Sequence, residues 1–372
     1  MEYIALKDVC KINMGQSPDS SSYNDNEDGI PFFQGNADFG ERYPVTRVWC
    51  NAPTKIAQPE DILISVRAPI GALNFAKEEC CIGRGLAALT PDRSKVSLEF
   101  IYWLLKGKNA ELNSKGTGST FKAISRKVLE EIMVPAIDFD KQHEYAEILE
   151  KIYSVIQKRK EELSALDNLI KARFVELFGD PSTNPKGYPV KVLPEIAEYW
   201  NGLTYKPEDV SDEGTIVLRS SNIQNATLDF ADTVRVSCKI GDKKYVQDND
   251  ILMCSRNGSA RLVGKVALIK DIEEPMSFGA FMMIIRSDYY PYLMTYFQMP
   301  AFRAQITTGA TTTINQITGR MLDIVKLPVP DMDVINEFAD FVNQVGKSKV
   351  AVQKALDETQ ILFDSLMQKY FG

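Results

Sequence analysis

Two long stretches of the chain carry apolar residues at alternating spacings of three and four positions. The first begins at Tyr145 and stops at Gly179, shortly before Pro181, and the second runs from Phe338 to Tyr370. This spacing places apolar side chains on one face of an α-helix, and glycine followed by proline commonly ends a helix. Because a narrow apolar stripe on so long a helix needs a partner, we predict that the two helices pack against each other. The residues expected at their interface are Ile152, Leu163, Leu166, Ile170, Phe174, Val345, Leu356, Phe363 and Met367.

The segments before the two predicted helices show shorter patterns. Strand-like runs occupy residues 62–66, 86–89, 215–218, 263–269 and 281–285, and short helices fit residues 98–105 and 291–297. Turns rich in Gly, Pro and Asn separate these elements. The mixture predicts an α+β fold class, with a globular module of mixed sheet and helix before each long helix.

The chain contains an internal duplication. Residues 121–179 align without a gap onto residues 314–372 over 59 positions, and Asp61-Ile62-Leu63 matches Asp250-Ile251-Leu252 further upstream. Self-similarity over so long a period predicts a repeated architecture. The predicted segments are a first module at residues 1–140, a long helix at 141–180, a second module at 181–333 and a second long helix at 334–372.

Composition is that of a folded protein, with 44% hydrophobic and 25% charged residues among 372. The balance of 43 basic and 50 acidic side chains gives a net charge of -7, which taken alone argues against a nucleic-acid partner. The sequence shows no long apolar run and no basic segment followed by an apolar one at Met1. We therefore expect a cytoplasmic protein with no membrane partner.

Several segments resemble catalytic or metal-binding motifs but lack residues that those motifs require. The six cysteines, Cys10, Cys50, Cys80, Cys81, Cys238 and Cys254, form no CxxC pair, and His143 is the one histidine, so we expect buried free thiols and no metal site. A glycine-rich run at 258–266 lacks the spacing and hydroxyl of a phosphate loop. An acidic cluster of Asp229, Asp232 and Asp242 leaves open a metal-dependent nuclease as an alternative.

Several motifs resemble those of one family. They are Gly15-Gln16-Ser17-Pro18, the run from Gly29 to Phe39, and the run from Gly118 to Pro135, with Gly309-Ala310-Thr311 and Leu327-Pro328-Val329-Pro330 in the same order in the second half. Together with the duplication, they resemble the target recognition domains of type I restriction-modification specificity subunits. The second module departs from the pattern in its longer first loop, 201–207, and at 218–223, where the first module has an aromatic strand.

The resemblance implies a noncatalytic DNA sequence-specificity subunit in which each module reads one half of a bipartite double-stranded DNA site. It implies that the long helices form an antiparallel coiled coil that docks two methyltransferase subunits and the restriction/translocase subunits. S-adenosylmethionine, ATP and Mg are then expected on those partners, and no cofactor on this chain. A stand-alone DNA-binding protein and a coiled-coil interaction protein remain as further alternatives.

Candidate DNA contacts gather at matching places in the two halves. Residues 106–127 hold six basic side chains against one acidic, and residues 252–270 hold four against none. The loop at 65–71 aligns with the loop at 255–261, each just after the shared Asp-Ile-Leu strand, and these are the leading base-reading loops. The candidates in the first half are Gln34, Asn36, Arg67, Arg84, Lys115, Thr117, Ser119 and Lys122. Those in the second half are Tyr205, Arg219, Ser221, Asn222, Arg256, Asn257, Ser259, Arg261, Thr311 and Thr312.

Overall fold

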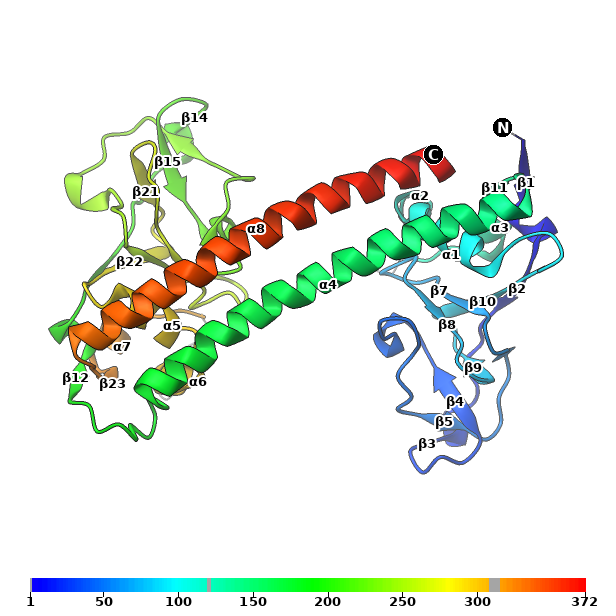
Figure 1. The fold of residues 1–372 in the computed structure, drawn as a ribbon, viewed down its shortest axis with the longest axis horizontal. Coiled ribbons are helices and arrows are strands. Elements are labelled where there is room, and N and C mark those ends of the chain that lie inside the picture. Colours follow the sequence, from blue (N-terminus) through cyan, green and yellow to red (C-terminus); the bar gives the residue numbers. More distant parts are fainter. Residues whose placement is uncertain (1, 119–121, 308–314) are drawn as a thin grey trace. The chain divides into compact units, whose positions relative to one another are not determined.

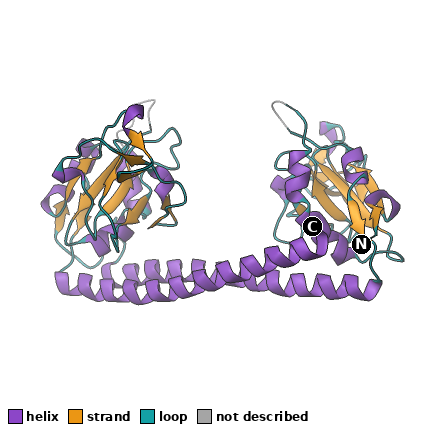
Figure 2. Ribbon diagram, turned by 90° about the horizontal axis from the view of Figure 1, so that it is seen from above, coloured by secondary structure: helices purple, strands orange, loops and turns teal. Residues whose placement is uncertain are grey.

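The computed structural model describes all residues except 1, 119–121 and 308–314. By its internal contacts the chain divides into two units. The first unit contains Met1–Glu161 and Gln353–Gly372, and the second contains Glu162–Val352. Each unit combines sheets with helices (Figure 2), so the predicted α+β class is confirmed.

The first unit is built around an antiparallel sheet in the order β2-β10-β7-β8. A second sheet, β3-β5-β4-β9-β6, contains one parallel pair, β4 with β9, and β1 pairs with β11. The strands are β1 (Tyr3–Ala5), β2 (Cys10–Met14), β3 (Tyr23–Asn24), β4 (Ile30–Phe33), β5 (Trp49–Cys50), β6 (Ile56–Ala57), β7 (Ile62–Ser65), β8 (Leu73–Phe75), β9 (Cys80–Ile82), β10 (Leu86–Pro91) and β11 (Met133–Pro135). The helices are α1 (Leu98–Gly107), α2 (Asn109–Ser114) and α3 (Arg126–Glu130), followed by the start of α4 (Phe139–Phe178).

The second unit repeats this plan. Its central sheet has the order β13-β22-β19-β20, β12 pairs with β23, and a further sheet, β14-β18-β15-β21, contains the parallel pair β15 with β21. The strands are β12 (Val190–Val192), β13 (Glu198–Asn201), β14 (Val210–Ser211), β15 (Thr215–Leu218), β16 (Ile223–Gln224), β17 (Thr227–Leu228), β18 (Arg235–Val236), β19 (Ile251–Cys254), β20 (Val266–Leu268), β21 (Met276–Phe278), β22 (Met282–Arg286) and β23 (Lys326–Pro328). The helices are α5 (Tyr290–Tyr296), α6 (Pro300–Thr307), α7 (Gly319–Asp323) and α8 (Met332–Phe371).

Strand register fixes which residues of the two units are equivalent. Leu63 pairs with Ala88 in the first unit, and Leu252 pairs with Ile284 in the second. The predicted duplication therefore extends to the pairing of the central strands. Every strand and short helix predicted from the sequence overlaps an observed one.

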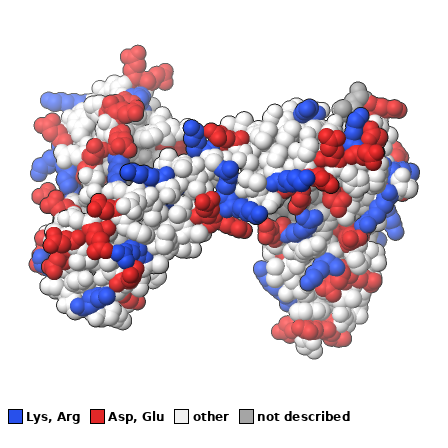
Figure 3. Space-filling view, in the orientation of Figure 1, with Lys and Arg blue, Asp and Glu red and all other residues white. Residues whose placement is uncertain are grey.

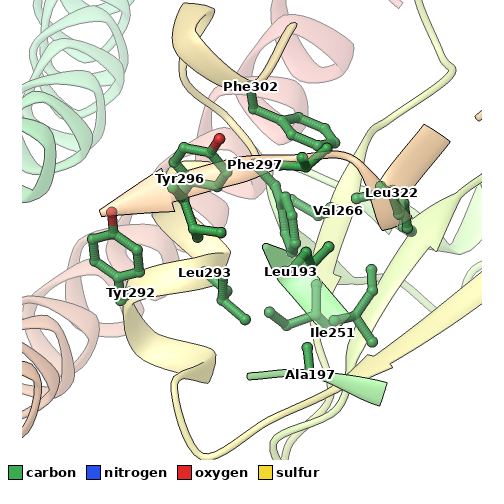
Figure 4. Packing of buried hydrophobic residues seen from close by; sticks show 14 of the residues in the cluster. Leu193, Ala197, Ile251, Val266, Tyr292, Leu293, Tyr296, Phe297, Phe302 and Leu322 are labelled. Carbon is green, nitrogen blue, oxygen red and sulfur yellow. The ribbon is translucent and has the colours of Figure 1, made fainter. Parts of the chain in front are cut away.

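Buried apolar side chains form a core in each unit. In the first unit, six consecutive residues of α1, Phe100 to Leu105, are buried. Ser97 caps this helix, and its backbone N–H donates to the side chain of Gln142, which is buried on α4. In the second unit, rings from α5 and α6 pack with Leu193 and Ile251 (Figure 4).

The long helices α4 and α8, each of 40 residues, run antiparallel within both units (Figure 1). In the first unit, the ring of Tyr145 stacks on that of Tyr370 with centroids 3.8 Å apart. In the second, the ammonium of Lys349 lies 2.6 Å from the carboxylate of Asp167. A second contact in each unit, Tyr153 with Phe363 and Arg173 with Glu337, lies further along α4 and further back along α8. The two helices are therefore antiparallel within each unit, as the resemblance implied.

The predicted interface stripe also packs on the modules. Phe363 of α8 contacts Trp103 of α1, with ring centroids 5.7 Å apart, and Phe174 of α4 stacks on Tyr292 of α5 at 5.1 Å. The predicted interface residues are all buried or half-buried. The stripe therefore joins each long helix to a globular core as well as to its partner helix.

Candidate nucleic-acid interface

Matching hydrogen bonds place the two predicted base-reading loops at equivalent positions. The N–H of Ile124 donates to the carbonyl of Val66 at 2.9 Å, and the N–H of Ile317 donates to that of Ser255 at 2.7 Å. Val66 thus corresponds to Ser255, one position away from the alignment predicted for these loops. Arg67 in the first unit is therefore equivalent to Arg256 in the second.

Both arginines are exposed, and the backbones around them are fixed. Arg67 forms a β-bridge with Ala123, and Arg256 forms one with Gln316. Among the described residues, neither guanidinium has a carboxylate partner within salt-bridge distance. The alternative that these arginines merely neutralise acidic side chains therefore finds no support in the described part of the chain.

In the second unit the Arg256 loop borders a cleft of about 1230 Å³. We call it the arginine cleft, and define it by Tyr205, Arg219, Ser221, Arg256, Asn257 and Phe281. Five of these six were predicted as DNA contacts from the sequence. Phe281 was missed because its apolar side chain fits the predicted strand 281–285, whereas the observed strand β22 begins one residue later.

Arg219 is held in place by the acidic side chain of Asp232. Its guanidinium lies 2.8 Å from that carboxylate, while its buried Nε has no hydrogen-bond partner among the described atoms.

Asn222, predicted as a DNA contact, is not on the surface of the cleft. It is fully buried, its amide donates to the carbonyls of Asp229 and Asp232, and its side chain accepts from the Arg219 N–H. Asn222 is thus a structural residue of this loop, and we leave it out of the contact set.

The corresponding place in the first unit gathers Gln34, Arg67 and Arg84. The N–H of Val66 donates to the carbonyl of Gly85, and the N–H of Gly85 donates to that of Gln34. All three predicted side chains are exposed. Asn36, in the turn that follows, is half-buried. Residues distant in the sequence therefore meet at one edge of the module.

The basic cluster at 106–127 is weaker than its count suggests. Lys115 pairs with Glu111 at 2.6 Å, and Arg126 pairs with Glu130 at 2.7 Å. Lys106 lies 3.5 Å from the ring centroid of Tyr153, and burial lowers its pKa to about 8. Lys122 stays exposed. The count overestimated the free charge because Glu111 within the window and Glu130 beyond it pair with these cations, and because Lys106 is largely buried.

Two cations of the second cluster also have internal partners. Lys265 donates to the Ile223 carbonyl at 3.1 Å, and Lys270 donates to the Asn343 side chain at 3.0 Å. Arg261 and Ser259 are exposed near Arg256 in sequence. Basic and acidic side chains alternate over the face in Figure 3. No extended basic patch is visible on that face.

The remaining predicted contacts lie near or outside the described residues. Thr117 is exposed and forms a β-bridge with Ala123, next to the Arg67 loop. Ser119, Thr311 and Thr312 lie outside the described residues.

The chemistry of a nuclease centre finds no support in the structure. Across residues 2–118, 122–307 and 315–372, no three His, Cys, Asp or Glu side chains gather closely enough to hold a metal ion. Asp232, one of the suspected ligands, is engaged by Arg219. The six cysteines are free thiols, five of them buried and Cys238 partly exposed. None of the described helices is long and apolar enough to cross a bilayer.

The fold and the site define a class: a duplicated α+β protein whose two units present equivalent arginine loops beside their central sheets. Residues 1–165 match the family model of the type I restriction modification DNA specificity domain. The resemblance drawn from the sequence is confirmed.

Known proteins extend the likeness to the whole chain. The chain is 45% identical over 152 residues to the putative type I restriction enzyme MjaX specificity subunit of Methanocaldococcus jannaschii, covering 41% of this chain and 36% of that protein. It therefore spans about a third of that relative's length. The type I restriction enzyme EcoBI specificity subunit of Escherichia coli is 20% identical, covering 99% of this chain and 85% of that protein. The crystal structure of a type I restriction-modification system S subunit from M. genitalium matches with TM-score 0.58 and 15% identity, covering 100% of this chain and 96% of that one, and shares the fold.

Proposed function

We propose that this chain is the noncatalytic DNA sequence-specificity subunit of a type I restriction-modification complex. Each unit reads one half of a bipartite double-stranded DNA site. The observation that carries the proposal is the equivalence of Arg67 and Arg256, both exposed on loops held by a β-bridge. Arginine on such a loop can bind guanine through two hydrogen bonds in the major groove.

The chain's acidity is compatible with this role if partners contribute to DNA binding. With a net charge of -7 and several lysines engaged internally, the chain alone is expected to bind DNA weakly. We propose two methyltransferase subunits and the restriction/translocase subunits as partners, in the cytoplasm. S-adenosylmethionine, ATP and Mg belong to those subunits, and this chain binds no cofactor. The relatives are named as subunits of restriction enzymes, which supports an assembly of this kind.

The test is methylome sequencing of cells that carry the modification subunits with and without this chain. We expect methylation at a split DNA sequence only when the chain is present. Exchanging Arg67 for Ala should relax the sequence at one half-site, and exchanging Arg256 for Ala should relax it at the other. Methylation that does not depend on the chain, or that occurs at an undivided site, would contradict the proposal.

A further inference from the structure

Phe281 stands in the arginine cleft as an exposed apolar ring beside a cation. Its exposed fraction is 59%, and the guanidinium carbon of Arg256 lies 5.2 Å from the ring centroid. The Arg256 N–H also donates to the Phe281 carbonyl at 3.1 Å. The ring and the guanidinium therefore lie side by side, and the backbone hydrogen bond between the two residues holds them together.

The first unit has no such ring at the equivalent position. The N–H of Val66 donates to the Gly85 carbonyl, as that of Ser255 does to the Phe281 carbonyl, so Gly85 corresponds to Phe281. A Cβ added at Gly85 would lie 2.3 Å from the Gln34 carbonyl oxygen, which forbids a side chain there. The scaffold needs no aromatic residue at this place, and Phe281 is a feature of the second unit alone.

The chemistry of the major groove supplies a partner for both side chains. Thymine is the one ordinary base that presents an apolar group there, its 5-methyl, and phenylalanine is among the side chains that contact it. Guanine presents O6 and N7, which accept two hydrogen bonds from arginine. Because the Arg256 and Phe281 side chains touch, the groups they contact must belong to neighbouring base pairs, roughly 3.4 Å apart along the helix axis.

We propose that Phe281 is a specificity-determining residue that contacts the 5-methyl group of a thymine next to the guanine bound by Arg256. The cleft surrounds this contact with the apolar ring of Tyr205 and with the polar side chains of Ser221 and Asn257. The inference rests on the proposed function of the chain. It predicts a thymine beside a guanine in the half-site of the second unit.

The experiment uses the chain assembled with its modification subunits and a duplex carrying the methylated sequence found in cells. Replacing that thymine by uracil removes only the methyl group. We expect the wild-type complex to bind the uracil duplex about four-fold more weakly, the factor that burial of one methyl group supplies. Phe281→Ala should bind the thymine duplex about four-fold more weakly and no longer distinguish the two duplexes, while Phe281→Leu should keep part of the preference.

Val190→Ala serves as the matched control, because Val190 is 57% exposed on β12 of the same unit. This variant should keep the full preference for thymine. A Phe281→Ala complex that still prefers thymine, or a half-site with no thymine beside a guanine, would overturn the inference. A loss of binding that is equal for both duplexes and leaves the thymine preference intact would do the same. Failure of the proposed function looks different, since no split site would then be methylated at all.

Discussion

The two units share a scaffold and differ in what that scaffold presents. Gly15 and Gly202 hold the same place in the two central sheets, donating to Leu86 and Met282. At the edge of the site the residues diverge, with Gly85 in one unit and Phe281 in the other. The comparison teaches that shared backbone hydrogen bonds keep the two arginine loops in position, while the side chains around them are free to differ.

The largest expected effect concerns the shared scaffold. A Cβ at Gly202 would lie 2.1 Å from the Phe278 carbonyl oxygen, and one at Gly15 would lie 2.1 Å from that of Gly83. Gly202→Ala and Gly15→Ala should each destabilise their own unit by about 3 kcal/mol, because backbone must move. Hydrogen exchange, which reports each unit separately, measures this. Gly241→Ala is the control, since nothing lies within 4 Å of its Cβ position. Equal stability of Gly202→Ala and Gly241→Ala would refute the shared constraint.

The second-largest expected effect is a loss of stability that should occur in the second unit and not in the first. Asp61 and Asp250 are equivalent and buried, and each accepts a backbone N–H from a residue three positions earlier. In the part of the chain that the structure describes, Asp250 alone of the two also pairs with an arginine, Arg286, through two contacts of 2.7 Å. Arg286→Ala should cost about 2 to 3 kcal/mol of unfolding free energy, because it leaves a buried charge unpaired.

The strand register supplies a control for Arg286. Thr90 holds the position equivalent to Arg286 in the first unit, and it is exposed. Thr90→Ala should change the unfolding free energy by less than about 0.5 kcal/mol. If urea unfolding finds similar losses for both variants, the ion pair does not distinguish the units.

A smaller effect is expected in DNA binding. Arg256→Ala should weaken binding of the assembled complex to its target by about 1 to 3 kcal/mol, the range for a bidentate contact with guanine. A gel-shift titration measures this. Arg126→Ala is the control, because Arg126 already pairs with Glu130. Unchanged affinity for the Arg256 variant would remove it from the site.

The smallest effect is a pH dependence of the first unit. Burial lowers the pKa of Lys106 to about 8. Below pH 8 the lysine is charged in both states, so the cost of burying it is fully present. Between pH 8 and 10 the folded state loses this proton first, the unfolded chain binds more protons, and stability rises with pH. The wild type should gain about 1 to 2 kcal/mol over this window relative to Lys106→Met, the lower figure allowing for solvent screening of a partly exposed side chain. Parallel pH curves of the two proteins would contradict the assignment.

The features that could be predicted from the sequence are those that depend on the spacing of apolar residues or on the internal duplication. The apolar spacing from Tyr145 onwards was enough for a long helix, and the duplication was enough to pair the two loops to within one residue. The sequence could not reveal that Asn222 is buried, because the carbonyls it binds come from a separate turn. Nor could it reveal the exposed ring of Phe281, whose surroundings depend on β22 ending its pairing at Met282.

The first unit includes residues 353–372, which close over it from the far end of the sequence. The ring of Phe371 lies 5.2 Å from that of Phe100, and Phe363 covers Trp103. During synthesis, roughly 210 further residues must therefore follow Glu161 before Phe371 is made and this core can be completed. At about 5 to 20 residues per second, that is a delay of roughly 10 to 40 s. The unit whose first strands are made earliest is thus the later of the two to have all its residues synthesised.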